Sequence, residues 1–213
     1  MKRSLFLMVL ALIIAIPSFG QTGPYLVDYF SNNPGPTKYL TEIPVATVAD
    51  QQIRLVNYGA AGTPMTSPDG DVCANIYVFD ANQEMISCCS CRITPNGLLT
   101  LSVGLNLASN PVTSVVPVSG DVKIVSTAAV GNTRCTPLTY NGGILDSLVG
   151  FGTHLQTSGG TILGTYLSET NIPFAALSAA EQGFLPQACQ FARYLGSGKG
   201  VCDCGLDSNG IIH

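Results

Sequence analysis

The cysteines are the feature that most limits what this chain can fold into. Eight of them occur after residue 72 and none before it. Disulfide bonds persist in exported proteins, so an even number of cysteines in an exported chain favours pairing over free thiols. Eight cysteines allow too many connectivities for the sequence alone to choose one. We expect disulfide bonds to engage Cys73, Cys88, Cys89, Cys91, Cys135, Cys189, Cys202 and Cys204.

The N-terminus has the pattern of an export signal. Two basic residues at positions 2 and 3 precede an uncharged apolar run, Leu5–Ile16. This run is shorter than the ~20 apolar residues that a transmembrane helix needs. Ser18 and Gly20 place small side chains at the positions that a signal peptidase reads. We therefore expect residues 1–20 to be a cleaved signal peptide and the mature chain to be secreted, into the periplasm or the extracellular space, without a membrane anchor.

The charge of the mature chain argues against two kinds of partner. The full sequence has 9 basic and 13 acidic residues, so removing the two basic residues of the signal leaves 7 − 13 = −6. Such a chain repels a polyphosphate backbone and an anionic membrane surface. Charged residues make up 10% of the sequence, against about 25% in ordinary soluble domains. We expect a nearly neutral surface and no nucleic-acid partner.

Short runs of β-branched and aromatic residues, separated by turn residues, dominate the middle of the chain. The expected strands are Ile43–Val48, Gln52–Asn57, Val72–Phe79, Gln83–Cys89, Leu98–Leu105, Asp121–Ser126 and Thr161–Leu167. About seven such strands predict a mostly β fold, an antiparallel β-sandwich over residues 39–171, for which an immunoglobulin-like architecture is one candidate. Residues 21–38 are rich in Pro and Asn, so we expect an irregular entry segment there.

The chain changes character near residue 172. Ser178 and Glu181 fit a capping box at a helix start. Pro186 can open a second helix, and Gly196 can end it. The expected apolar face of that second helix consists of Cys189, Phe191, Ala192 and Leu195. We expect residues 172–213 to form a small α-helical, disulfide-tied appendage that packs on the β domain.

A predicted hairpin determines the first expected disulfide. The two strands around Asp80-Ala81-Asn82 place Cys73 opposite the segment Cys88-Cys89-Ser90-Cys91. Residues directly opposite each other on neighbouring strands are close enough for a bridge once the strands twist. We therefore expect Cys73 to bond with one of the three cysteines of that segment. Adjacent Cys88 and Cys89 point to opposite faces of a strand, so they are expected to serve different bridges.

The C-terminal cysteines suggest a local bridge. After a helix from Pro186, the glycine-rich residues 196–200 can act as a flexible link and bring the chain back alongside Cys189. We expect Cys189 to bond with Cys202 or Cys204, and the remaining one to pair with Cys135 or with the 88–91 segment.

Other chemistries for the same residues are weaker. Thiolates of the 88–91 segment with Cys202 and Cys204 could hold zinc or copper(I), but no histidine accompanies them. A thioredoxin-like thiol needs a helix N-terminus, whereas this C-x-x-C lies at a strand end. We assign no metal-binding, cofactor-binding or catalytic residue from the sequence, and no cofactor.

Acidic residues and histidines offer no clear catalytic set. Asp69, Asp71, Asp80 and Glu84 could supply oxygen ligands to calcium, but they fall where hairpin turns are needed. The mature chain has two histidines, His154 and His213, and no Gly-x-Ser-x-Gly elbow. His154 is expected to be structural or solvated in a loop around Gly152-Thr153-His154.

Four sequence blocks carry a resemblance to known proteins. These blocks are Cys73-Ala74-Asn75-Ile76-Tyr77-Val78-Phe79-Asp80, Cys88-Cys89-Ser90-Cys91, Thr94-Pro95-Asn96-Gly97-Leu98 and Ser197-Gly198-Lys199-Gly200-Val201-Cys202. With them the chain resembles uncharacterised secreted bacterial proteins that share such blocks, over about a third of its length. The resemblance implies an extracytoplasmic β domain that bears cysteines, and it implies no activity.

The sequence favours a non-enzymatic function. A cross-linked scaffold with low charge and no catalytic set predicts a secreted structural or binding module at the cell surface or in the extracellular matrix. Its expected partners are a second copy, an extracellular protein or a carbohydrate. The alternative is a secreted hydrolase that uses carboxylates among Asp69, Asp71, Asp80 and Glu84. Two of these carboxylates together in a cleft would favour the enzyme.

Overall fold

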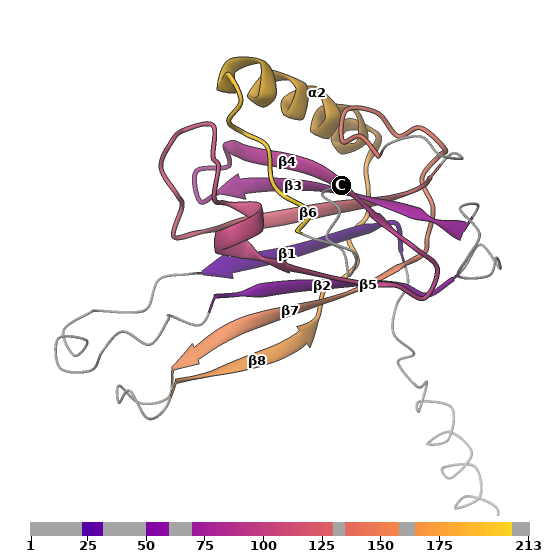
Figure 1. Ribbon diagram of the computed structural model, residues 1–213, viewed down its shortest axis with the longest axis horizontal. Coiled ribbons are helices and arrows are strands. Elements are labelled where there is room, and N and C mark those ends of the chain that lie inside the picture. The colour runs from indigo at the N-terminus through magenta and orange to yellow at the C-terminus, as the bar shows by residue number, and fades with distance from the viewer. Residues whose placement is uncertain (1–22, 32–49, 60–69, 130–134, 158–164, 206–213) are drawn as a thin grey trace, which may run out of the picture.

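The computed structural model describes residues 23–31, 50–59, 70–129, 135–157 and 165–205. Two antiparallel four-stranded sheets face each other in this part of the chain (Figure 1). Sheet A has the order β1-β6-β3-β4, with β1 at Tyr25–Ser31, β6 at Ser119–Ala128, β3 at Val72–Asp80 and β4 at Met85–Ile93. Sheet B has the order β5-β2-β7-β8, with β5 at Leu98–Ser102, β2 at Gln52–Asn57, β7 at Leu148–Thr157 and β8 at Thr165–Asn171.

The predicted β-sandwich is confirmed, and its strand order is now defined. In sheet A the first strand pairs with β6 rather than with the next strand along the chain. This order differs from the A-B-E-D and C-F-G sheets of an immunoglobulin domain. The expected strand at 43–48 and the expected signal peptide lie outside the described residues.

One helix of the described residues, α2 at Ala179–Gly196, lies across the outer face of sheet A (Figure 1). Sheet A is therefore covered on both faces, by sheet B on the inner side and by α2 on the outer side. This explains why β3 is buried along nearly its whole length. Its inner side chains, such as Ile76 and Val78, join the core between the sheets, whereas Tyr77 and Phe79 join a second core under α2.

Two strands escaped prediction for a shared physical reason. Residues 21–38 were expected to be irregular, but β1 forms there and pairs with β6 from Tyr25 to Ser31. Its buried Asp28 interrupts the apolar pattern of a strand. β7 contains two glycines, and an added Cβ on Gly152 would lie 2.0 Å from the Asp28 carboxylate. The glycine that suggests a loop is therefore what lets β7 approach β1 so closely.

Two other elements differ from expectation. The strand expected at 98–105 ends at Ser102, because the Asp50 carboxylate accepts the Gly104 N–H at 3.0 Å and turns the chain into a π-helix, η3, at Val103–Leu107. The C-terminal helix is a single 18-residue element that runs through Pro186 rather than two short helices. Ser178 caps it as expected, since its Oγ accepts the Glu181 N–H at 3.1 Å.

Candidate functional site

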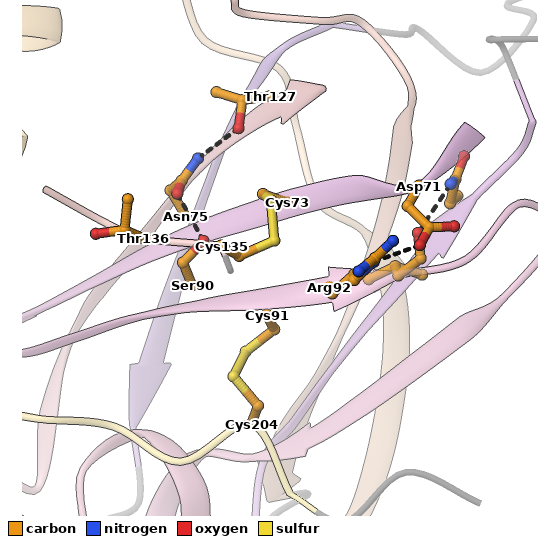
Figure 2. The surroundings of a disulfide bond; sticks show 12 residues. Asp71, Cys73, Asn75, Ser90, Cys91, Arg92, Thr127, Cys135, Thr136 and Cys204 are labelled. Carbon is orange, nitrogen blue, oxygen red and sulfur yellow. Dashed lines mark hydrogen bonds and ion pairs between the residues drawn. A yellow bond between two sulfur atoms is a disulfide. The ribbon is translucent and has the colours of Figure 1, made fainter. Parts of the chain in front are cut away.

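The structure pairs all eight cysteines in four disulfides: Cys73–Cys135, Cys88–Cys189, Cys89–Cys202 and Cys91–Cys204. Adjacent Cys88 and Cys89 serve different bridges, as expected. Cys73–Cys135 and Cys91–Cys204 lie on opposite faces of the β3–β4 hairpin (Figure 2). Three of the four bonds connect β4 to the C-terminal segment, so β4 is the strand to which the end of the described chain is tied.

The expected bond between Cys73 and the 88–91 segment is wrong, because the hairpin has a different register. The strands shift at Val78/Phe79, which places Cys73 opposite Arg92 rather than opposite a cysteine. Cys89 and Cys91 lie opposite Ile76 and Ala74, on the inner face. Cys73 points to the outer face, where Cys135 meets it.

The expected local bond from Cys189 to Cys202 or Cys204 is also wrong. Cys189 is on the buried side of α2, and α2 rests on the outer face of sheet A, so its partner is Cys88 of that face. The chain after α2 then passes the edge of β4, where the Cys88 N–H donates to the Gly200 carbonyl at 3.1 Å. Both downstream cysteines bond with the 88–91 segment, which confirms that this segment ties the tail to the sandwich.

Three sulfurs lie close enough together to suggest a metal site. The Sγ atoms of Cys89, Cys91 and Cys204 are all within 4.8 Å of one another, and the three residues are buried. Metal binding requires thiolates. Each of these sulfurs is held in a disulfide, so in this state the cluster is a pair of adjacent cross-links.

A series of contacts among buried polar side chains connects the two sheets on the β1 side. The Gln51 amide oxygen accepts the Ser31 N–H at 2.6 Å, which turns the amide nitrogen toward His154 Nδ1 at 3.1 Å. The ring hydrogen then resides on Nε2, which lies 3.4 Å from Asp28 Oδ1. The exposed Tyr29 ring stacks on His154 at a centroid distance of 4.4 Å. His154 lies in β7 rather than in the expected loop, and it is buried.

The Asp28–His154 pair does not provide a catalytic base. A general base needs a ring nitrogen directed at substrate, and both ring nitrogens of His154 are engaged by Gln51 and Asp28. Burial raises the pKa of the Asp28 carboxyl, and the neighbouring His154 offsets part of that rise. The arrangement fixes β1 against β7 at the cost of burying a carboxylate.

Replacing Asp28 by Asn is expected to change how stability depends on pH. A carboxyl whose pKa is raised by folding binds its proton more tightly in the folded state. The wild type should therefore lose stability as pH rises from about 4, the ordinary carboxyl pKa, through the raised value. Asp28→Asn keeps an acceptor oxygen for His154 and removes this loss.

Urea unfolding at pH 4, 5, 6 and 7 measures the difference. Stability of the wild type relative to Asp28→Asn should fall across this range. The exposed carboxylate variant Asp203→Asn controls for the loss of one charge. Parallel curves for wild type and Asp28→Asn would contradict the expectation.

Polar contacts as well as a disulfide fix α2 on sheet A. Glu181 Oε1 accepts from Lys123 Nζ at 2.7 Å and from the Tyr25 hydroxyl at 3.1 Å. Lys123 Nζ also lies 4.6 Å from the centre of the Phe79 ring. Asp121 Oδ1 has no hydrogen-bond partner within the described ranges, and burial raises the pKa of its carboxyl, an effect that Lys123 partly offsets. The contacts of Glu181 thus add to Cys88–Cys189 in holding α2 against sheet A.

A mostly apolar groove runs along α2. It has a volume of about 580 Å³ and lies between the helix, the β3–β4 turn and residues 112–113. Its polar lining residues are Glu84, Thr113 and Gln187. The apolar side chains that line it include Met85, Val112, Phe184, Ala188, Phe191 and Leu195.

Sequence reasoning misplaced the aromatic part of this groove. Phe191 and Leu195 were expected in the same buried face as Cys189 and Ala192. Only the last two are buried; Phe191 is 64% exposed and Leu195 is 55% exposed. Phe184 is 50% exposed as well. The sequence did contain a signal for an exposed apolar surface, since α2 has more apolar residues than are needed for one face packed against a sheet.

Two charged side chains lie at or beside the groove. Glu84 is exposed in the β3–β4 turn and lines the groove. Lys199 follows Leu195 beyond the end of α2, and its Nζ donates to Ser114 Oγ beside the groove wall. Residues 196–200, which were expected to be a flexible link, form an ordered turn. Ser197 has a φ of 48°, the Gly200 carbonyl accepts the Cys88 N–H, and the Gly200 N–H donates to the Asn110 carbonyl.

Among the described carboxylates considered for a hydrolase, Asp71 lies at the other end of β3 from Asp80 and Glu84, which share the β3–β4 turn. Asp69 lies outside the described residues. Asp71 is buried and forms an ion pair with Arg92 at the end of the hairpin (Figure 2). Asp80 Oδ1 accepts the N–H groups of Asn82 and Glu84 at 2.9 and 3.0 Å, as a hairpin turn requires.

The fold and the cross-links define a class, a disulfide-bonded antiparallel β-sandwich that carries a helix. No protein-family model matches the chain, and no curated protein matches its sequence. A solved structure, the Anabaena sensory rhodopsin transducer, aligns at 12% identity with a TM-score of 0.33, over 54% of this chain and 94% of that one. At this TM-score the likeness carries no argument about function. No helix within the described ranges is long and apolar enough to cross a membrane.

Proposed function

We propose that this protein is a secreted, disulfide-stabilised binding module at the cell surface or in the extracellular matrix, and that it binds an apolar protein surface through the α2 groove. The observation that carries the proposal is the exposed row of Phe184, Phe191 and Leu195 along that groove. Exposed apolar surface bordered by polar residues is typical of protein interaction sites.

The attachment of α2 supports a binding role. Cys88–Cys189 and the Lys123–Glu181 ion pair hold the helix in place before any partner arrives. A groove that is already ordered loses little conformational entropy on binding, which favours affinity. Secretion is supported by the export pattern of residues 1–20 and by four disulfides, which are typical of oxidising compartments.

A protein partner fits the groove better than the alternatives. Carbohydrates need several directed hydrogen bonds, and only Glu84, Thr113 and Gln187 among the lining residues carry polar side chains. A hydrolase needs two carboxylates facing one cleft. Asp71 is engaged by Arg92, and Asp80 is engaged by its own turn.

Peptide selection tests the proposal. A displayed library is selected against the oxidised protein, and the enriched peptides are synthesised and titrated. We expect sequences with apolar anchors, whose affinity falls at least about tenfold in Phe191→Glu, because one buried Phe contributes roughly 1.5–3 kcal/mol. Leu98→Glu is the matched control, because Leu98 is 62% exposed on β5 and does not line the groove.

Two outcomes would count against the proposal. One is a selection that enriches no peptide. The other is a set of peptides that bind wild type and Phe191→Glu equally well, which would place their site elsewhere.

A further inference from the structure

We propose that four cysteines, which the structure pairs in two disulfides, form a zinc site when they are reduced: Cys89, Cys91, Cys202 and Cys204. Two of them lie on β4 and two on the chain that follows α2. Their sulfurs belong to the core between the sheets, whereas the α2 groove lies on the other face of sheet A. The inference is therefore independent of the proposed function.

The four cysteines form two pairs with the spacing C-x-C, and each pair directs both sulfurs to one side of its segment. Cys89 and Cys91 are two positions apart on β4, so both face the core between the sheets. Cys202 and Cys204 are both buried, whereas Asp203 between them is exposed. Two segments that are distant in sequence thus supply two sulfurs each to the same place.

The sulfurs are close enough to bind one ion. The Sγ atoms of Cys89, Cys91 and Cys204 all lie within 4.8 Å of one another, and Cys202 is bonded to Cys89. In a tetrahedral zinc site the Zn–S distance is about 2.3 Å, which separates the sulfurs by about 3.8 Å. Small side-chain movements therefore suffice to convert the two opened disulfides into one four-thiolate site.

Backbone hydrogen bonds align the two segments independently of the sulfur–sulfur bonds. The Cys88 N–H donates to the Gly200 carbonyl at 3.1 Å, and the Cys202 N–H donates to the Cys88 carbonyl at 3.3 Å. The Asp203 N–H donates to the Asn106 carbonyl at 2.8 Å. These contacts favour the same alignment of β4 and the C-terminal segment when zinc, rather than two disulfides, joins them.

The number of cysteines exceeds what cross-linking needs. Cys89–Cys202 and Cys91–Cys204 join the same two segments. Once one bond has formed, the other closes only a small ring and removes little further entropy from the unfolded chain. Four cysteine ligands, in contrast, are the complete set of a closed structural zinc site. The two adjacent bonds therefore fit a metal-binding state better than they fit cross-linking alone.

The conversion between the two states transfers four electrons. Two equivalents of a dithiol reductant open the two disulfides and are themselves oxidised to disulfides. The four cysteine thiols then release four protons as their thiolates bind Zn²⁺. A disulfide oxidant reverses the conversion: it takes up four electrons and four protons, the two protein disulfides form again, and the zinc is released. Thiolate ligands select a soft or borderline ion such as zinc over calcium or magnesium.

Protection of thiols in the wild-type chain tests the proposal. The mature protein is reduced by a phosphine, freed of metal, mixed with one equivalent of zinc and then treated with an alkylating reagent. We expect peptide mapping to find the four proposed ligands unmodified and the other cysteines alkylated, because a zinc-bound thiolate is not free to react. Without zinc all eight should be alkylated. Equal modification of all eight in the presence of zinc, or protection of Cys88 and Cys189, would overturn the proposal.

Two matched variants measure the affinity. C73A/C88A/C135A/C189A keeps the proposed ligands, and C89A/C91A/C202A/C204A keeps the other four cysteines. Competition of the reduced chains with a chromophoric zinc chelator should show one site in the first variant that is at least about 100-fold tighter than any in the second. Loss of a group that only orients a ligand already costs about 10–100-fold. Because both variants carry four thiols, equal affinities would mean that zinc is captured by thiols without a site.

Oxidation of the zinc complex tests the reverse step. Addition of a disulfide oxidant to the wild-type complex should release the zinc, and peptide mapping should recover Cys89–Cys202 and Cys91–Cys204. Zinc that stays bound after these two disulfides have formed would mean that its ligands lie elsewhere in the chain.

Discussion

Reduction of all four disulfides is expected to unfold this protein at 25 °C. Cys73–Cys135 closes a loop of 62 residues. The shortest covalent ring that Cys88–Cys189 closes passes through Cys73–Cys135 and has about 70 residues. The two C-terminal bonds then add small rings of about 14 and 4 residues. In the chain-entropy model the four together stabilise the fold by about 13 kcal/mol. Typical domains have a total stability of about 5–15 kcal/mol.

Far-ultraviolet circular dichroism and urea unfolding, with and without a phosphine reductant, measure this effect. The oxidised protein should unfold in one cooperative transition, and the reduced protein should lack that transition in the absence of urea. Hydrogen exchange is a second probe: the β3 amides should lose their protection from exchange on reduction. A reduced chain that keeps the same urea midpoint would mean that the sandwich core alone suffices.

The central part of the fold could be predicted because its residues follow local rules. β2 was predicted with the bounds that the structure has, since Gln52–Asn57 alternates buried and half-buried residues between turn residues. The cap at Ser178 was equally local. β1 and β7 could not be found this way, because Asp28 and Gly152 make sense only when the two strands lie together.

The disulfide pairing depended on information that the sequence does not contain. The two expected bonds that proved wrong, from Cys73 and from Cys189, both assumed that neighbours in sequence become neighbours in space. Cys189 instead meets Cys88, 101 positions away, because α2 folds back over sheet A. A shift in the β3–β4 register was enough to place Cys73 beyond reach of the 88–91 segment.

The candidate groove was hidden for a related reason. The sequence identified Phe191 and Leu195 as apolar members of a helix face. It could not show that sheet A covers only the side of α2 that carries Leu185, Cys189 and Ala192. Which apolar residues remain exposed depends on the rotation of the helix on the sheet, and the Cys88–Cys189 bond contributes to fixing that rotation.

Removing Cys73–Cys135 is expected to destabilise the protein more than removing Cys91–Cys204, although the second bond spans 113 residues and the first only 62. Cys89–Cys202 already joins the same two segments as Cys91–Cys204, so the latter closes a ring of only about 4 residues. The chain-entropy model then assigns about 2 kcal/mol to Cys91–Cys204 and about 4 kcal/mol to Cys73–Cys135, which no other bond duplicates.

Urea unfolding of the oxidised double variants C73A/C135A and C91A/C204A measures the two losses. Cys91 is fully buried, and alanine there leaves a small cavity, which works against the expected order and makes the comparison strict. Removing Cys89–Cys202 together with Cys91–Cys204 should lower stability by more than the two separate losses combined, because each bond keeps the other's ring small. Two results would show that native contacts rather than ring size determine what each cross-link contributes. One is an equal loss of stability in C73A/C135A and C91A/C204A. The other is strict additivity when Cys89–Cys202 and Cys91–Cys204 are removed together.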